Sequence, residues 1–421
     1  MSLRSRIRGV CFGGRSAGIA ILLKYKQIFI LCLLAIALFA TTAPIGPNDL
    51  SRYLSIVSLA KGEGLVIDQG LQQADTMDKI LIKGHFYSDK PPLFALTFAP
   101  IYYGARLSGI ALDNKYLYKL AILLIMGTFF ALAMTLFYKE YAARFPELQW
   151  LLLGLIFATP YYVFNRVLMS HALVGSLLYI AFYLIRKKEG SYFPLWAGLL
   201  SGLAITYDNG AGFLFCSFIL YLSWNRRWRD LVLLVAASLL PIIIHLLIVY
   251  QLSGSWLPLN THSEYFNYPG SYFANGSGSG NLKFSEPFSL LGYMLALLFI
   301  FPFGYLSKGL FLTAPILIFA FIQMGREARA GKAAAFTLLI GILLLFFYYA
   351  LTSNNLAGGD YAVRWFIIFM PLCLPYVVKY YAAGENKKGW RGWFNFALIV
   401  SLLISLLYSF VSWLGGVTPL F

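Results

Sequence analysis

Charged residues are scarce in this chain, and their scarcity excludes an ordinary soluble domain. Only 12% of its 421 residues are Asp, Glu, Lys or Arg, whereas 60% are hydrophobic and the mean hydropathy is +0.72. Soluble globular domains carry about 25% charged residues. The chain is therefore predicted to be an integral membrane protein.

Cysteine is also rare, and acidic residues are outnumbered. The chain has four cysteines, none in CxxC spacing, which argues against a disulfide framework or a zinc site. Its 33 Lys and Arg residues against 17 Asp and Glu give a formal net charge of +16. Because the basic residues stand in short clusters between apolar runs, they indicate membrane topology and attraction to anionic lipid, not nucleic-acid binding. The sequence contains no Gly-rich phosphate loop, HExxH motif or serine elbow.

Long apolar runs are what the chain has in abundance. A membrane-spanning helix needs about 20 apolar residues, whereas the apolar region of a signal peptide has roughly 7–15, so the first run is expected to be a retained helix. We expect an all-α polytopic membrane protein with about 11 transmembrane helices, within a range of about 10–13. The expected spans are residues 25–43, 116–138, 150–164, 167–185, 192–207, 210–224, 231–250, 309–324, 334–352, 362–381 and 393–413. Segments 94–110 and 288–305 are expected to be short or interfacial helices.

The basic clusters assign a side to each loop. With eleven spans, segments such as "RKKEGSY" and "ENKKGWRGW" share a side with the basic N-terminus, 1–24, and the positive-inside rule puts that side in the cytoplasm. The other side receives the long loops 44–115 and 251–308 and nearly every unusual polar cluster. We therefore predict one membrane domain, 1–421, with an extracytoplasmic active site and juxtamembrane helices in its first loop.

The segment "PNDLSRYLSIVSLAKGEG" directly follows the first span. Its apolar spacing predicts a helix that ends at Gly62 or Gly64. Asp49 is well placed as the N-cap of this helix. An N-cap alone does not explain Arg52 and Tyr53, which stand one turn later on the same side as Asp49. A functional carboxylate is the alternative interpretation.

A second cluster, "HFYSDKPPL", contains Tyr87, Asp89 and Lys90. Two prolines follow Lys90, and proline fixes the backbone where a helix is predicted to begin, at Leu93. Lys90 either snorkels towards lipid headgroups or makes a point-charge contact with a lipid phosphate. Asp89 either has a functional role or simply caps or pairs with a neighbouring lysine.

Two further basic residues stand where spans begin after long outer loops. Arg364 follows "SNNLAGGDYAV", and Lys308 stands in "YLSKGLF". Both positions suit recognition of anionic oxygen. Asp360 and Arg364, four residues apart, can instead neutralise each other.

Three ionisable residues fall at or near the outer membrane edge. Arg166 stands at that edge with His171 about five residues deeper, and such groups usually face a cavity or a partner. A histidine satisfied by a backbone carbonyl is the alternative. Asp208 lies in a turn that favours Asp-Asn-Gly by itself. His245, in a continuous apolar run, is interpreted as a packing residue.

One carboxylate, several cations and aromatic loops thus converge on one membrane face, which suits activation of a hydroxyl beside an anionic phosphate. The motifs resemble the GT-C superfamily of polytopic membrane glycosyltransferases, which use polyprenyl-phosphate sugars. Within it they are most similar to the bacterial branch of lipid A aminoarabinose transferases and protein O-mannosyltransferase-like proteins. The resemblance covers most of the chain and rests on the order and sidedness of "PNDLSRYLSIVSLAKGEG", "YSDKPPLFAL", "SKGLFLTAPIL" and "GGDYAVRWFIIFMPL".

The resemblance implies inverting transfer of a sugar from a polyprenyl-phosphate donor to an extracytoplasmic acceptor, which would be a lipid, a cell-envelope glycan or a protein. It implies that Asp49 is the catalytic base or the residue that orients the acceptor, and that Lys90 binds the lipid phosphate. Arg364 and Lys308 would be further donor contacts, and Arg52 is a further candidate for binding the donor phosphate. The acidic pair of the family is Asn48-Asp49 here, so a divalent metal stays an alternative. For a bacterial source, the carrier would be undecaprenyl phosphate and the location the inner membrane. The residues expected to line the substrate cavity are Asn48, Tyr53, Tyr87, Asp89, Arg166, His171, Asp208 and Asp360.

Two other functions fit the same residues. A lipid or polyprenyl-glycan flippase or transporter would also place cations beside a lateral groove, and an inactive relative would act as a scaffold in envelope assembly. Few charges stand midway through the expected spans, which is less typical of a transporter. A neutral isostere at Asp49 separates these functions, because a transporter or scaffold tolerates it and a catalytic base does not.

Overall fold

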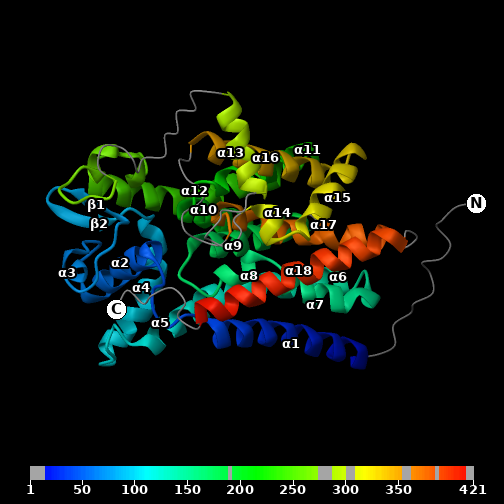
Figure 1. The fold of residues 1–421 in the computed structure, drawn as a ribbon, viewed down its shortest axis with the longest axis horizontal. Coiled ribbons are helices and arrows are strands. Elements are labelled where there is room, and N and C mark those ends of the chain that lie inside the picture. Colours follow the sequence, from blue (N-terminus) through cyan, green and yellow to red (C-terminus); the bar gives the residue numbers. More distant parts are fainter. Residues whose placement is uncertain are drawn as a thin grey trace, which may run out of the picture.

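The computed structural model describes residues 15–187, 192–273, 287–299, 309–352, 362–384 and 388–413. Helices make up most of this part of the chain and form an elongated bundle, with a small helix-and-hairpin region at one end (Figure 1). The predicted site residues Lys308 and Asp360 lie outside the described residues.

Every apolar run that was expected to span the membrane forms helix, often over slightly different bounds. The helices of the bundle are α1 (Arg15–Phe39), α5 (Lys115–Ile122), α6 (Thr128–Ala142), α7 (Gln149–Phe157), α8 (Pro160–Phe164), α9 (Ser170–Ile185), α10 (Phe193–Tyr207), α11 (Ala211–Trp224), α12 (Trp228–Ser253), α13 (Pro287–Phe299), α14 (Leu310–Thr313), α15 (Leu317–Arg329), α16 (Ala333–Thr352), α17 (Met370–Ala383) and α18 (Lys388–Trp413). A π-helical segment, Leu123–Gly127, joins α5 to α6, and a 3₁₀ segment, Arg364–Phe369, precedes α17.

Five of these continuous helical stretches are long and apolar enough to cross a bilayer, and five further apolar helices are shorter. The long ones are Lys115–Ala142, Trp228–Ser253, Ala333–Thr352, Arg364–Ala383 and Gly389–Phe410. Their length and composition support an integral membrane protein. The count of eleven spans stays a prediction.

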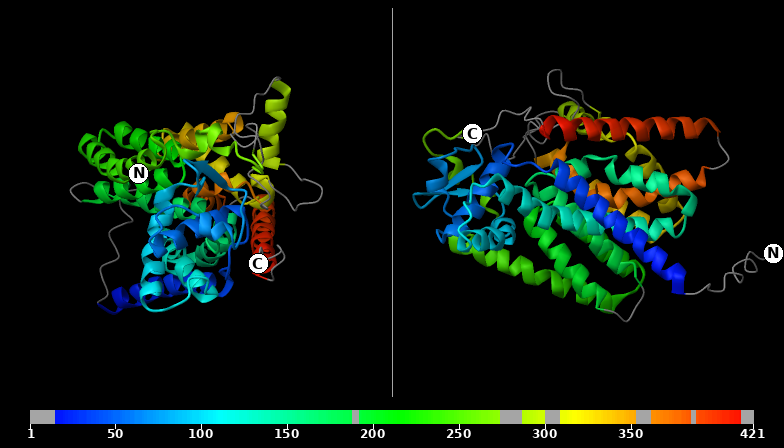
Figure 2. Two further views of the ribbon diagram at one scale, coloured as in Figure 1. Left: turned by 90° about the vertical axis from the view of Figure 1, so that its left-hand side faces the viewer. Right: turned by 90° about the horizontal axis from the view of Figure 1, so that it is seen from below.

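The first long loop folds against one end of the bundle as α2 (Pro47–Lys61), α3 (Asp68–Leu71), β1 (Lys79–Ile82), β2 (His85–Ser88) and α4 (Pro92–Leu107), coloured blue to cyan in Figure 2. The hairpin β1–β2 was not predicted. Its antiparallel register pairs Lys79 with Ser88, and its two-residue turn, Lys83-Gly84, has positive φ at both positions, as tight hairpins require.

Helix α2 begins at Pro47 with Gly46 as its N-cap, so the interpretation of Asp49 as the N-cap is wrong. Proline at the first helical position has its φ already set for the helix, and this moves the start two residues ahead of Asp49. The predicted end is confirmed, since the helix stops at Lys61 and Gly62 takes the left-handed conformation. Helix α4 begins at Pro92, one residue before the predicted start.

Close packing between α10 and α12 sets the position of the α10–α11 turn. A Cβ atom at Gly202 would lie 2.4 Å from the Ser238 carbonyl oxygen, and one at Gly198 would lie 2.3 Å from that of Leu234. These helices therefore approach each other backbone to backbone, as small residues allow in membrane bundles. The turn after α10, which carries Asp208, is held on this rigid pair.

Candidate functional site

A cavity of ≈ 250 Å³ lies between the first-loop region and the ends of several bundle helices. Seven residues that the sequence singled out line this one cavity, although they come from five separate segments. They are Asn48, Arg52, Asp89, Lys90, His171, Asp208 and Arg364. Further lining side chains are Ser170 of α9, Tyr207 of α10, His245 of α12, Tyr349 of α16 and Trp365 of the 3₁₀ segment.

Arg52 is the most enclosed cation of the site. It follows Asn48 by one helical turn on α2, so both side chains share the face of α2 that borders the cavity. Its guanidinium donates to the Asn48 carbonyl oxygen at 3.1 Å and to the Ser170 hydroxyl at 3.1 Å, and it lies 5.5 Å from the centre of the Phe94 ring. Arg52 is only 3% exposed. These hydrogen bonds of the buried guanidinium thus go to neutral groups.

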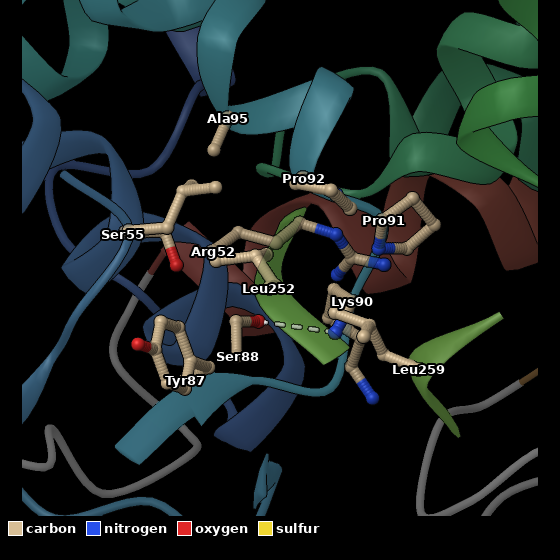
Figure 3. Close-up of a pocket in the computed structure, with 11 residues that line it drawn as sticks. Arg52, Ser55, Tyr87, Ser88, Lys90, Pro91, Pro92, Ala95, Leu252 and Leu259 are labelled. Atoms are coloured by element: carbon tan, nitrogen blue, oxygen red, sulfur yellow. Dashed lines mark hydrogen bonds between the residues drawn. The ribbon is translucent and has the colours of Figure 1, made fainter. Parts of the chain in front are cut away.

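Lys90 stands at the end of the hairpin, where Pro91 and Pro92 turn the chain into α4 (Figure 3). Its backbone N–H donates to the Ser88 hydroxyl at 3.1 Å, and its Nζ lies 2.7 Å from Asp89 and 3.2 Å from Asp78. Burial raises the pKa of Asp89, and the adjacent Lys90 ammonium partly opposes this rise. The predicted pairing of Asp89 with a neighbouring lysine is present, and Lys90 still borders the cavity.

His171 and Asp208 form a hydrogen-bonded pair at the wall of the cavity. His171 lies in the first turn of α9, and its Nδ1 is 2.5 Å from an Asp208 carboxylate oxygen. The other oxygen of Asp208 accepts from the Gly210 N–H at 2.8 Å and from the Tyr349 hydroxyl at 3.1 Å. Burial acts to raise the pKa of Asp208, but His171 and these donors hold it below its usual value.

Arg364 joins the site at the start of the 3₁₀ segment. The next residue, Trp365, stacks on Tyr349 with ring centres 4.6 Å apart and planes 5° from parallel. Because Tyr349 also donates to Asp208, one stacked pair connects the Arg364 segment with the His171–Asp208 pair. His171 interacts electrostatically with both Arg364 and Arg52. The cations and the histidine therefore share one electrostatic environment.

Four predicted residues lie outside the lining of this cavity. Asp49 is 1% exposed in the first turn of α2, where it interacts electrostatically with Arg52 and with Tyr118 of α5. Tyr53 donates to the Leu112 carbonyl oxygen at 2.9 Å. Tyr87 borders a smaller hollow next to Arg52 and Lys90 (Figure 3).

Arg166 is the fourth, and it binds elsewhere in the bundle. It is fully buried and donates to the Phe39 carbonyl oxygen at 2.9 Å and to that of Ser409 at 3.2 Å. These contacts tie the end of α1 to α18. They account for a buried arginine without a substrate.

Comparison with solved structures identifies proteins with a similar fold. No protein-family model matches the chain, and no curated protein sequence matches it. The apo structure of ArnT from Cupriavidus metallidurans is similar over 90% of this chain and 62% of ArnT, with a TM-score of 0.50 and 14% sequence identity. The protein has the GT-C fold. The structure of the same ArnT bound to undecaprenyl phosphate has a TM-score of 0.49 and 15% sequence identity, over 87% of this chain and 60% of ArnT.

An apo oligosaccharyltransferase from Archaeoglobus fulgidus gives a TM-score of 0.47 and 11% identity, over 91% of this chain and 56% of that protein. The chain thus spans about three fifths of the length of the ArnT structures. At these identities the similarity concerns the fold. The positions of the cavity residues described above follow from contacts within this chain, not from the solved structures.

Several cavity residues were missed in the sequence. His245 was interpreted as a packing residue; it is buried in α12 and also borders the cavity, which the sequence did not indicate. Ser170 precedes His171, and Trp365 follows Arg364, so proximity to residues already singled out was the available signal. Tyr349 lies inside an apolar run, and nothing in the sequence distinguishes it.

A metal site was left open by the sequence. Among the residues that the structure describes, there is no group of three or more His, Cys, Asp and Glu side chains that could hold an ion. Asp89 is instead paired with Lys90, and Asp208 with His171. A divalent metal stays an untested prediction.

Proposed function

We propose that this GT-C protein transfers a sugar from a polyprenyl-phosphate donor to an acceptor hydroxyl or amine bound in the same cavity, on the extracytoplasmic side of the membrane. The observation that carries the proposal is Arg52. A buried guanidinium that donates to neutral groups beside Lys90 and Arg364 is a ready partner for an anion. A lipid phosphate supplies that anion, and the apolar bundle supplies the surface for its chain.

In the proposed reaction, an acceptor oxygen or nitrogen forms a bond to the anomeric carbon while the bond from that carbon to the phosphate oxygen breaks. Attack from the face opposite the phosphate inverts the configuration. The polyprenyl phosphate leaves with the electron pair of the broken bond. Arg52, Lys90 and Arg364 would stabilise the charge that develops on it, and a general base would accept the acceptor's proton.

Asp49 is the base that the family resemblance implies, and this assignment stays a prediction. Its carboxylate lies next to Arg52 but not among the residues that line the cavity, so direct proton transfer requires a local movement of α2. Without that movement, Asp49 would act by holding the Arg52 guanidinium in place. An Asp49→Asn variant addresses the role directly.

The test is sugar transfer by the purified protein in nanodiscs, with a panel of polyprenyl-phosphate sugars. Undecaprenyl phosphate, the lipid bound in the ArnT structure, is the first carrier to use. Release of free polyprenyl phosphate with a glycosylated acceptor supports the proposal, and repeating the reaction with EDTA decides whether a metal takes part. Donor binding without turnover for any acceptor class contradicts it and favours a flippase or a scaffold.

A further inference from the structure

We propose that His171, positioned by Asp208, is the general base that deprotonates the acceptor in this cavity. The inference rests on the proposed transfer function and differs from the role that sequence resemblance gives to Asp49. It starts from one geometric fact: His171 and Asp208 are the histidine and carboxylate that line the cavity as a bonded pair.

The ring nitrogens of His171 have different surroundings. Nδ1 is bonded to Asp208 at 2.5 Å, which leaves Nε2 as the nitrogen available to a molecule in the cavity that His171 lines. A neutral imidazole that donates from Nδ1 has its lone pair on Nε2, and that lone pair can accept a proton. The carboxylate fixes both the tautomer and the orientation of the ring, as it does in other histidine-based active sites.

Asp208 is itself held rigidly. Its second oxygen accepts from the Gly210 N–H and from the Tyr349 hydroxyl, and Tyr349 is fixed by its stack on Trp365. Gly210 leaves no room for a side chain, because a Cβ there would lie 2.8 Å from Tyr349 and 3.1 Å from Asp208. An Asp-Asn-Gly turn between two helices forms without these contacts to Tyr349 and Trp365, so the turn alone does not explain them.

The pair also lies at a suitable place relative to the cations. Asp208, Arg52 and Arg364 interact electrostatically with His171. The other charged and titratable groups that line the cavity are Lys90, Asp89, His245, Tyr207, Tyr348 and Tyr349. Ser170, the neighbour of His171 in α9, accepts from Arg52. A donor phosphate on the cations would therefore lie in the same cavity as the His171 imidazole.

The proton transfer balances with the proposed reaction. As the acceptor oxygen bonds to the anomeric carbon, its proton passes to Nε2 of His171. The imidazolium that forms is stabilised by the Asp208 carboxylate across the Nδ1–H bond. The phosphate departs with its electron pair, and the imidazolium then returns the proton to water or to the phosphate monoester.

The experiment measures transfer and donor binding for wild type, His171→Ala, Asp208→Asn and Asp49→Asn in nanodiscs that contain undecaprenyl-phosphate sugar. His85→Ala is a matched control, because His85 pairs with Asp68 at 2.8 Å in the hairpin region and does not line the cavity. We expect His171→Ala to lose roughly 10²–10⁴-fold in kcat while it still binds donor, which also shows that it is folded. Added imidazole should restore part of this rate.

The pH profile gives a second readout. The wild-type rate should fall as pH drops through the histidine range, because a protonated imidazole cannot accept a proton. His171→Ala rescued by substituted imidazoles should follow the pKa of the added base, a dependence that a structural role would not produce. Asp208→Asn should retain donor binding, lose kcat and alter the pH profile, since an amide does not stabilise the imidazolium.

The outcomes separate this inference from the function on which it rests. If wild type transfers no sugar from any donor, the proposed function is overturned and the base assignment with it. If wild type transfers sugar and His171→Ala does so at a similar rate, only the base assignment is overturned. If His171→Ala loses activity that no imidazole restores while Asp49→Asn also loses it, the base is Asp49.

Discussion

Two groups of buried or partly buried charges in this bundle differ in what surrounds them. Glu140 and Arg186, on α6 and after α9, form a two-pronged ion pair at 3.0 and 2.8 Å, and Glu327 pairs with Lys379 at 3.0 Å. In the cavity, by contrast, Arg52 donates to neutral groups, although Lys90 and His171 of the same cavity are each paired with a carboxylate. Paired charges can serve the fold, whereas a buried guanidinium that donates to neutral groups beside a cavity indicates a ligand.

The two groups lie at opposite ends of shared helices. Helix α9 begins at the cavity with Ser170 and His171 and reaches Arg186 about 22 Å further on, at 1.5 Å per residue. The continuous helical stretch Arg364–Ala383 likewise begins at the cavity and carries Lys379 near its end. The closed ion pairs thus anchor the helices whose other ends bear the site.

Among the substitutions that test this comparison, Lys90→Met should have the largest effect. Losing one cation from the developing phosphate charge should reduce kcat/KM roughly 10²–10³-fold. Steady-state transfer in nanodiscs measures it. Lys79→Met is the matched control, because Lys79 pairs with Asp75 on the hairpin outside the cavity. Equal losses in both variants would mean that the hairpin fold, not the phosphate contact, is what matters.

Arg186→Met should act on stability instead of turnover. Removing one partner of a buried ion pair costs about 3–5 kcal/mol, and we expect roughly 2–3 kcal/mol here because this pair is only partly buried and Arg144 still pairs with Glu140 at 3.1 Å. Thermal unfolding in detergent measures the loss. Turnover per folded molecule should stay at the wild-type level. A turnover defect at wild-type stability would break the contrast between the two charge groups.

Arg364→Lys should lose roughly tenfold in donor affinity, because lysine keeps the charge but not the planar fork of donors that matches a phosphate. Binding of undecaprenyl phosphate measures it. Arg326→Lys is the control, since Arg326 stacks on Tyr380 at the opposite end of the bundle. Unchanged affinity in Arg364→Lys would remove Arg364 from the phosphate site.

The smallest effect concerns pH and Asp208. Because the folded state lowers the pKa of this carboxyl, its stabilising contribution is present above the ordinary aspartate pKa and is lost as pH falls through the lowered value. Wild type should therefore lose more stability than Asp208→Asn as pH is lowered from about 5 towards 3. Unfolding in detergent at several pH values measures the difference. Parallel curves would contradict the assigned ion pair.

The sequence predicted the helices and much of the cavity, for identifiable reasons. Long apolar runs allow little besides membrane helix, and the polar clusters stood where those runs end. Lys90 and Arg364 could be singled out because charges at such positions need a partner. Tyr349 could not, since a tyrosine in an apolar helix gives no sign of its contact with Asp208, 141 positions away in the chain.

The hairpin and the position of Asp49 are two features that the sequence did not predict. Strands of four residues are too short for alternation to distinguish them from loop, although Lys83-Gly84 carried the turn chemistry. Asp49 shares a helix with Arg52, but helical spacing does not say which of the two reaches the cavity. That depends on how α2 packs against α4 and α5, a long-range property.

The Tyr349–Trp365 stack has a thermodynamic consequence. It connects Asp208, on the acceptor side of the proposed reaction, with Arg364 on the donor side. A donor that shifts Trp365 would change the affinity for the acceptor, and linkage requires the acceptor to change the affinity for the donor by the same factor. A substitution such as Trp365→Leu should therefore weaken the cooperativity between the two substrates more than the binding of either one alone.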